Sequence, residues 1–250
     1  MKNYLIINLL LFSILLLFTS ACSDSVDSNN DNDETPVVPV EPELVYYWYF
    51  DVTIPNDTEL INIPSTYRAG NSTGTIRFES SLSGYPETDR NASMERRNRT
   101  TAINYRPEGN DGMPYTEAAD SMRAIQVREP FTGDSGANTL FLDLPTTGYE
   151  KVVLSFAAMD EGAVNGLRFD YSISSGTPQW ISAGLPANQI EQSLVNDEYL
   201  PIEVDFSEIQ GVNDNPEFKV RIRFDVSDGT RNEGDRVTFN NFALDAAPID

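Results

Sequence analysis

The stretch FKVRIRFDV, residues 218–226, decides the fold class of this chain. Apolar side chains occupy every second position from Phe218, and a charged side chain stands between each pair of them. A repeat of two is the period of a β-strand, and the charged face indicates that only the opposite face is buried. The stretch therefore predicts a strand of an antiparallel sheet with one side against a core.

Other strand-like runs precede and follow this stretch, and turn-forming Gly, Pro, Asn and Asp residues separate them. The further strands we expect are 46–51, 74–80, 122–129, 138–144, 151–159, 166–174, 200–206 and 236–244. Strands that follow one another without strong helices between them favour a sandwich over βαβ units. We therefore predict an all-β fold, an antiparallel, jelly-roll-like β-sandwich. In residues 82–121 we expect long loops around a short strand near 101–105.

Near the start of the chain, the basic residue Lys2 is followed by an apolar run over residues 4–18 and a short polar segment that ends at Cys22. This is the order of a secretory signal, and the run is shorter than the roughly 20 residues that span a bilayer. The segment 17–22 (LFTSAC) resembles the lipobox of bacterial lipoproteins, which implies that Cys22 is acylated and becomes the first mature residue. The alternatives are a free buried cysteine or an uncleaved anchor helix. No other cysteine occurs in the chain, so a lipidated Cys22 leaves no thiol for a disulfide or a nucleophile.

Residues 22–44 form an acidic, proline-containing segment that cannot bury enough apolar surface to order itself. The domains we expect are therefore a signal peptide over 1–21, a disordered tether over 22–44 and a single sandwich domain over 45–250. Acidic residues directly after Cys22 resemble the surface-export signal of Bacteroidota lipoproteins. That resemblance implies an outer-membrane lipoprotein exposed at the cell surface, with the membrane as a partner through the lipid.

The charge of the chain excludes some classes of partner and of chemistry. The 39 Asp and Glu against 17 Lys and Arg give a net charge of −22, which argues against binding of nucleic acid or anionic lipid. The absence of His removes the commonest general base and the Ser-His-Asp triad. Catalysis by carboxylates remains open.

The segment from 125 to 244 resembles a β-sandwich domain found in extracellular Bacteroidota proteins. The matching stretches are IQVREPF (125–131), LDLPTTGYEKVVLSFAAM (142–159), GLRFDYSIS (166–174), IEVDFSEIQGVNDNPEFKVRIRF (202–224) and FNNFAL (239–244). Such domains are the jelly-roll or galactose-binding-like modules of polysaccharide-degrading and adhesive proteins. The resemblance indicates the fold and leaves the function open, because this sandwich hosts many functions. The family pattern more often has R-F-D-N where this chain has FNNF, so that Asn240 stands at the position of the Asp.

Aromatic and arginine side chains are the candidates for sugar contacts, because sugar rings stack on Trp and Tyr while polar side chains bind the hydroxyls. If Tyr46, Trp48 and Phe50 face the core, alternation turns Tyr47 and Tyr49 outward. The aromatic residues that we expect to contact a sugar are Trp180, Tyr47, Tyr49, Tyr85, Tyr105 and Tyr115. Arg96 and Arg97 lie in the most basic stretch and fit carboxylated or sulfated sugars. The alternative is that these two arginines pair with the acidic surface of the protein itself.

Calcium is a further candidate, because acidic loops supply the six to eight oxygen ligands it needs. Asp225, Asp228 and Asp245 lie near expected strand ends, and modules of the resembled type often hold a structural calcium ion there. The alternative is that these residues form turns and solvate the surface.

Three functions remain in competition on the sequence alone. The first is a surface lipoprotein that binds a polysaccharide, which the aromatic content favours. The alternatives are an adhesion or scaffold protein without a small-ligand site, and a carbohydrate-active enzyme that uses a pair of carboxylates. An exposed Trp180 beside further aromatic rings would favour binding, whereas paired acids in a groove would favour an enzyme.

Overall fold

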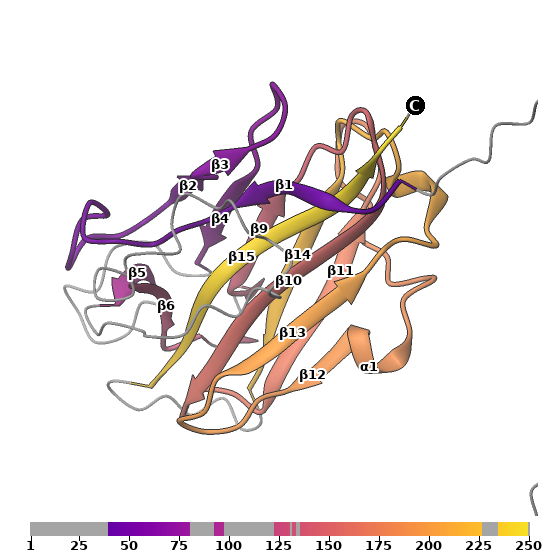
Figure 1. The fold of residues 1–250 in the computed structure, drawn as a ribbon. Coiled ribbons are helices and arrows are strands. Elements are labelled where there is room, and N and C mark those ends of the chain that lie inside the picture. Colours follow the sequence, from indigo (N-terminus) through magenta and orange to yellow (C-terminus); the bar gives the residue numbers. More distant parts are fainter. Residues whose placement is uncertain are drawn as a thin grey trace, which may run out of the picture. The chain divides into compact units, whose positions relative to one another are not determined.

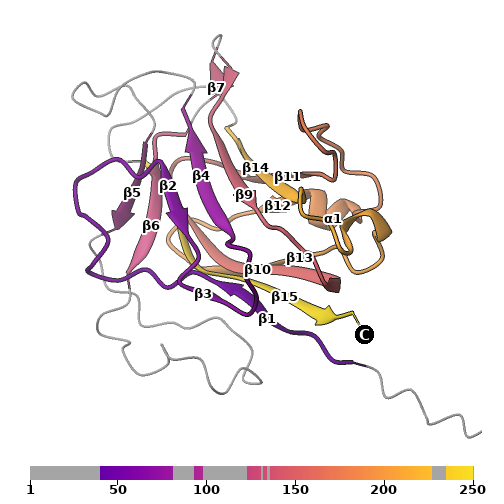
Figure 2. The same ribbon diagram turned by 90° about the horizontal axis from the view of Figure 1, so that it is seen from above.

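Two antiparallel sheets face each other in the computed structural model, and Figures 1 and 2 show them from the side and from above. The structure describes residues 40–80, 93–97, 123–130, 132–133, 136–226 and 235–249. Residues from Pro39 onward form one compact unit. No helix among the described residues is long and apolar enough to cross a membrane.

The larger sheet has seven strands, and its central strand is β15. Its members are β1 (Glu43–Tyr47), β3 (Tyr67–Arg68), β5 (Ser93–Arg97), β6 (Ala124–Arg128), β10 (Tyr149–Glu161), β13 (Leu200–Asp205) and β15 (Arg236–Pro248). The order is β13-β10-β15-β1-β3, and β6 pairs with the first part of β15 and carries β5 at its other edge. One long strand thus has two shorter neighbours on the same side.

The smaller sheet has six strands in the order β12-β11-β14-β9-β4-β2. Its members are β2 (Asn62–Pro64), β4 (Thr75–Glu79), β9 (Thr139–Asp143), β11 (Gly166–Ser172), β12 (Glu191–Ser193) and β14 (Lys219–Asp225). The remaining described elements are short: the β7–β8 pair (Thr132–Gly133 and Gly136–Ala137), α1 (Ala187–Ile190) and η1 (Gln210–Val212). The predicted all-β antiparallel sandwich is confirmed.

The core lies between the two sheets and follows the period-two pattern of the sequence. In β14 the apolar positions are 6% exposed or less, while the charged positions between them keep part of their surface in solvent. Each of the nine expected strands overlaps a strand of the structure. Strand β5 was missed, because 93–97 was expected to be loop, and the strand expected near 101–105 lies outside the described residues. Strand β1 begins at Glu43, inside the expected tether.

The prediction that Tyr47 and Tyr49 face solvent is wrong. Their exposed fractions are 1% and 8%, and they form a second apolar cluster with Ala243, on the face opposite Trp48. The Tyr47 hydroxyl accepts a hydrogen bond of 2.8 Å from Asn241. Alternation holds from Tyr46 to Phe50, after an irregular step at which the neighbours Val45 and Tyr46 both enter the core, but the outer face is covered as well, so Tyr47 and Tyr49 are not exposed. Trp48 lies in the core, as expected.

The FNNF stretch builds a β-bulge into β15. Between its pairings with Ser155 and Ala157 the strand contains one extra residue, and Asn241 there has a φ of 53°. Asn tolerates this left-handed conformation better than most residues. The extra residue turns both Phe239 and Phe242 toward the core, where both rings pack on Phe156.

Candidate functional site

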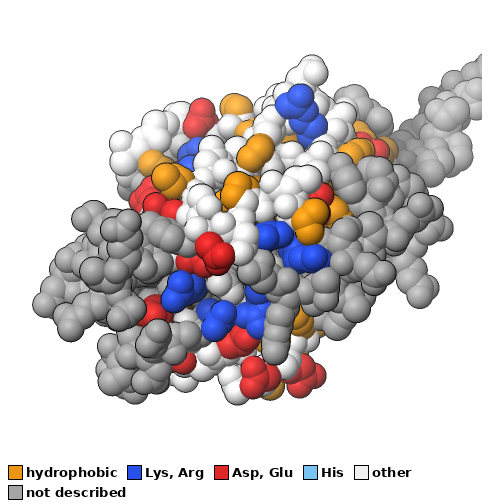
Figure 3. Space-filling view, turned by 90° about the vertical axis from the view of Figure 1, so that its left-hand side faces the viewer, with side chains coloured by type: hydrophobic (Ala, Val, Ile, Leu, Met, Phe, Trp, Pro, Cys, Tyr) orange, Lys and Arg blue, Asp and Glu red, His pale blue; other side chains and the backbone are white. Residues whose placement is uncertain are grey.

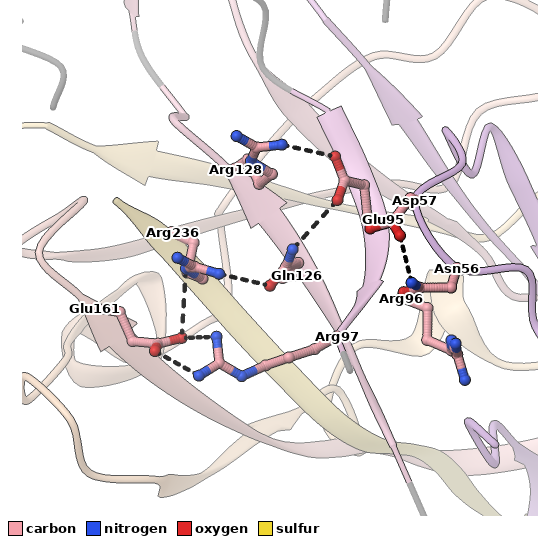
Figure 4. A pocket seen from close by; sticks show the side chains of 9 residues that line it. All are labelled: Asn56, Asp57, Glu95, Arg96, Arg97, Gln126, Arg128, Glu161 and Arg236. Atoms are coloured by element: carbon pink, nitrogen blue, oxygen red, sulfur yellow. Dashed lines mark hydrogen bonds and ion pairs between the residues drawn. The ribbon is translucent and has the colours of Figure 1, made fainter. Parts of the chain in front are cut away.

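A polar pocket of about 470 Å³ opens on the seven-stranded sheet, on the face away from the core (Figure 4). Its volume falls within the range of roughly 300–1,000 Å³ typical of small-ligand sites. The described side chains that line it are Asn56, Asp57, Glu95, Arg96, Arg97, Gln126, Arg128, Glu161 and Arg236. All nine are polar or charged, so the pocket is built for hydrogen bonds and not for apolar contact.

The register of four strands brings the lining residues together. Arg236 on β15 lies opposite Arg128 on β6 on one side and opposite Glu161 on β10 on the other. One step along, Gln126 lies opposite Glu95 on β5 and opposite Thr238 on β15. The residues between these rows, such as Val127 and Val237, belong to the core. The lining residues of these four strands therefore share the face of the sheet that points away from the core.

Arg97 and Glu161 form a nearly buried ion pair that spans the sheet. The Arg97 guanidinium donates to both carboxylate oxygens of Glu161, and the Nη2–Oε1 distance is 2.6 Å. Their side chains are 8% and 14% exposed. Arg97 lies opposite Ala124, whose methyl group leaves room for the arginine to extend toward β10. Thr238 donates a further hydrogen bond of 2.8 Å to Glu161.

Glu95 is the second carboxylate of the pocket, and its side chain is 4% exposed. It accepts hydrogen bonds from Ser93 at 2.9 Å and from Gln126 at 3.3 Å, and Arg128 approaches it at 3.4 Å. The amide oxygen of Gln126 accepts a bond of 3.3 Å from Arg236. Gln126 thereby links the two acid–arginine groups into one network. These contacts occupy the carboxylate oxygens that a general acid would have to present to a substrate.

The loop after β1 closes the pocket at the edge of β5. It is tied to that strand by a hydrogen bond of 2.8 Å from the Leu60 N–H to the Met94 carbonyl. The Asn56 amide donates to Asp57, while Asn56 Oδ1 is buried and has no hydrogen-bond partner. Such a buried acceptor without a donor costs free energy. The loop residues Asn56 and Asp57 thus form one side of the pocket, opposite the arginines of the sheet.

The pocket is basic in a strongly acidic protein. Its lining holds four arginines and three carboxylates (Asp57, Glu95 and Glu161), so four positive and three negative charges leave it at +1. The whole chain carries −22. In the view from the side of β5 and β6, basic and acidic side chains lie next to one another near the centre of the face (Figure 3). Because the described lining carries a net positive charge while the whole chain is strongly negative, the pocket suits an anionic group.

The structure brings Arg96 and Arg97 into this one site. The two alternative roles proposed for Arg97 are thereby resolved in favour of an internal ion pair, since both of its terminal nitrogens bind Glu161. Arg96 lines the pocket at its edge next to Asn56 and Asp57 (Figure 4). No local pattern marks the partners from β6, β10 and β15, because they are far apart along the chain. Only the strand register shows that Arg128, Glu161 and Arg236 meet.

Trp180 packs against the six-stranded sheet, whereas the pocket lies on the seven-stranded sheet. Its ring is half-buried, with its centroid 5.5 Å from that of Phe141 on β9, and the guanidinium of Arg221 lies 4.7 Å from its centroid. Arg77 lies over the Phe141 ring at 4.9 Å. The tryptophan therefore belongs to a stack of rings and arginines on the outer face of the six-stranded sheet. Its described aromatic neighbour is Phe141, and a role of Trp180 in sugar binding stays a prediction.

The candidate calcium ligands do not come together among the described residues, in which no group of three or more acidic, His or Cys side chains could hold a metal ion. Asp225 lies 3.7 Å from Arg168 on the six-stranded sheet, and Asp245 lies on β15 of the seven-stranded sheet. Asp228 lies outside the described residues, as do Tyr85, Tyr105, Tyr115 and Cys22. A calcium ion bound with the help of such residues stays a prediction.

No protein-family model and no curated protein matches this chain. Among solved structures, the N-terminal CBM22-1–CBM22-2 tandem domain of Xyn10C from Paenibacillus barcinonensis is similar at 9% identity and a TM-score of 0.43. The alignment covers 84% of this chain and 48% of that one, so the chain spans about half of that structure.

Two further structures show the range of proteins with a similar architecture. The xylan-binding module CBM15 aligns at 11% identity and a TM-score of 0.37, over 76% of this chain and 99% of its own. A cyclase from Fischerella sp. TAU aligns at 14% identity and a TM-score of 0.34, over 87% and 94%. Carbohydrate-binding modules are thus among the structures similar to this chain, and so is an enzyme. At such low identities the likeness does not decide what this chain does.

Proposed function

We propose that this protein binds a polysaccharide without cleaving it, and that the pocket on the seven-stranded sheet receives one of the sugar units. The observation that carries the proposal is the composition of the pocket. Its nine described lining residues are polar or charged, and they surround a space large enough for a small ligand. Sugars present many hydroxyl groups, each a donor and an acceptor, which suits a pocket that holds arginine donors and carboxylate and amide acceptors.

The network is held in place before any ligand arrives, which favours binding. Glu161 and Glu95 each accept several hydrogen bonds, and the exposed fraction of both side chains is low. A preorganised site loses little conformational entropy when a ligand binds. An adhesion or scaffold protein without a small-ligand site would have no need to keep charged groups in a pocket, since burying charge is costly unless it is paired.

A lipid on Cys22 is the second part of the proposal. It would hold the protein at the outer membrane, exposed at the cell surface, with the sandwich joined to the lipid by the acidic segment 22–44. Several acyl chains on one residue anchor a protein stably, because each buried methylene contributes about 0.8 kcal/mol. The polysaccharide would then be captured close to the membrane.

A glycan-array screen of residues 39–250, with and without a chelator of divalent cations, tests the proposal. We expect at least one polysaccharide to bind. Asn56→Ala and Asp57→Ala should weaken that binding, because both residues line the pocket. Trp180→Ala is the matched control on the other sheet and should leave binding unchanged. Absence of any bound glycan in both conditions, or a loss confined to the Trp180 variant, would overturn the assignment to this pocket.

A further inference from the structure

We infer that the pocket selects sugar units that carry a singly charged acid group, a carboxylate or a sulfate ester, and that Arg128 and Arg236 bind its oxygens. This inference rests on the proposed glycan binding and names the class of ligand. It starts from the position of the two arginines. They are direct partners on β6 and β15 and point into the same pocket (Figure 4).

Two like charges in directly opposite positions destabilise a sheet. The described contacts of the two arginines with acids are longer than that of Arg97. The Arg128–Glu95 contact is 3.4 Å long and the Arg236–Glu161 contact 4.0 Å, whereas Arg97 binds Glu161 with two short hydrogen bonds. Glu161 thus makes its shortest hydrogen bonds with Arg97. An oxyanion between Arg128 and Arg236 would relieve the repulsion between them.

The exposed fractions of the arginine side chains agree with a supporting role for Arg97 and a ligand-binding role for Arg128 and Arg236. The side chains of Arg128 and Arg236 are 29% and 31% exposed, while that of Arg97 is 8% exposed. Arg97 is therefore a supporting residue that holds Glu161 in place. Arg128 and Arg236 keep guanidinium surface available to a ligand in the pocket, and the planar fork of arginine suits two-oxygen groups.

The charge of the pocket sets the charge of the ligand. Among the described lining residues, four arginines face three carboxylates, an excess of one positive charge. A uronate carboxylate and a sulfate ester each bring one negative charge to the arginine pair, whereas a neutral sugar brings none.

Titration calorimetry of the full chain, in a detergent without a sugar headgroup, tests the inference. The probes are tetramers of galacturonate, glucuronate and mannuronate, the same tetramers with their carboxylates reduced to alcohols, and a sulfated galactose tetramer. We expect at least one acidic tetramer to bind about tenfold to a hundredfold more tightly than its neutral counterpart, with binding that weakens as salt is added. The carboxylate and sulfate arms identify which acid group is preferred.

Arg128→Gln and Arg236→Gln should each reduce this affinity by about tenfold to a hundredfold. Arg128→Lys keeps the charge but loses the fork, so we expect a smaller loss. Arg168→Gln is the matched control, since it removes one positive charge from a side chain 44% exposed on the other sheet. The thermal unfolding of each variant shows whether it is folded.

The outcomes separate this inference from the proposed function. Equal affinity for acidic and neutral tetramers would overturn the acid subsite and leave glycan binding intact. Acidic tetramers that bind equally well to the Arg128, Arg236 and Arg168 variants would also overturn it. A chain that binds none of these probes, nor any glycan of the array, would overturn both proposals.

Discussion

Arg128 and Arg236 lie directly opposite each other on neighbouring antiparallel strands, in a protein with a net charge of −22. Neither strand forces a charged residue there, since acidic or neutral polar side chains are equally compatible with the outer face of a sheet. The pair is flanked by Glu95 and Glu161, which belong to the same hydrogen-bonded network. The network therefore concentrates positive charge at one point and holds it there, which is the arrangement expected of a site for an anionic ligand.

Removal of Arg97 should destabilise the fold more than removal of the whole Arg97–Glu161 pair. Arg97→Met leaves a carboxylate that is 14% exposed without its main partner, so we expect a loss of about 3–5 kcal/mol in the free energy of unfolding. Arg97→Met combined with Glu161→Gln should recover part of that loss. Urea unfolding measures both, and a single variant as stable as the wild type would show that the pair does not support the pocket.

The bulge at Asn241 should matter through the phenylalanines it turns inward. Phe242 is fully buried, and its ring stacks on Phe156 with centroids 4.6 Å apart. Phe242→Ala should therefore reduce the free energy of unfolding by about 3–5 kcal/mol. Ile61→Ala, at a side chain that is 66% exposed, is the control and should change it by less than about 0.5 kcal/mol. Equal effects of the two substitutions would contradict the packing described here.

Asp143 should add to the free energy of unfolding at neutral pH, and this contribution should disappear at low pH. Burial alone would raise its pKa, but hydrogen bonds from Lys219 and Arg77, both 2.8 Å long, outweigh burial and hold the pKa below its usual value of 3.8. A carboxyl with a lowered folded-state pKa stabilises the fold above the unfolded-state pKa, and this contribution is lost as the pH falls through the folded value.

Asp143→Asn should therefore be less stable than the wild type at neutral pH, and the difference should shrink as the pH falls below 3.8. Urea unfolding over this range of pH provides the measurement. Asp225→Asn is the control, because that side chain is 45% exposed and its nearest arginine nitrogen is 3.7 Å away. A constant difference between the Asp143 variant and the wild type at all pH values would contradict this account.

Cys22 should decide where the protein resides. Cells that express the chain and are fed a fatty-acid analogue should label the wild type and leave Cys22→Ala unlabelled. The variant should leave the membrane fraction or remain unprocessed, because no other cysteine is present to take the lipid. Labelling of the variant would refute the role of this residue.

The sequence was most informative where one face of a strand meets the core. Alternation in 218–226 and in the other expected strands predicted the sandwich, because apolar residues at every second position line up on one face of a strand. The same rule misled at Tyr47 and Tyr49, since alternation says which side chains share a face and not whether that face is covered. The bulge at Asn241 inserts one extra residue into β15, and a strict period of two does not predict such an insertion.

The pocket could be predicted only in part. Arg96 and Arg97 stood out because they lie in the most basic stretch of an acidic chain. Their partners come from strands more than thirty positions further along, and nothing in residues 122–129 or 236–244 marks them as neighbours. Strand pairing is a long-range property, so the register had to be seen before Arg128, Glu161 and Arg236 could be assigned to one site.

A crystal structure of the protein with a uronate or sulfated tetramer that binds it is the most direct test of the central claim. The account predicts electron density for one sugar unit in the pocket, with its acid group between the guanidinium groups of Arg128 and Arg236. Density for the sugar on the Trp180–Phe141 face, with an empty pocket, would contradict it.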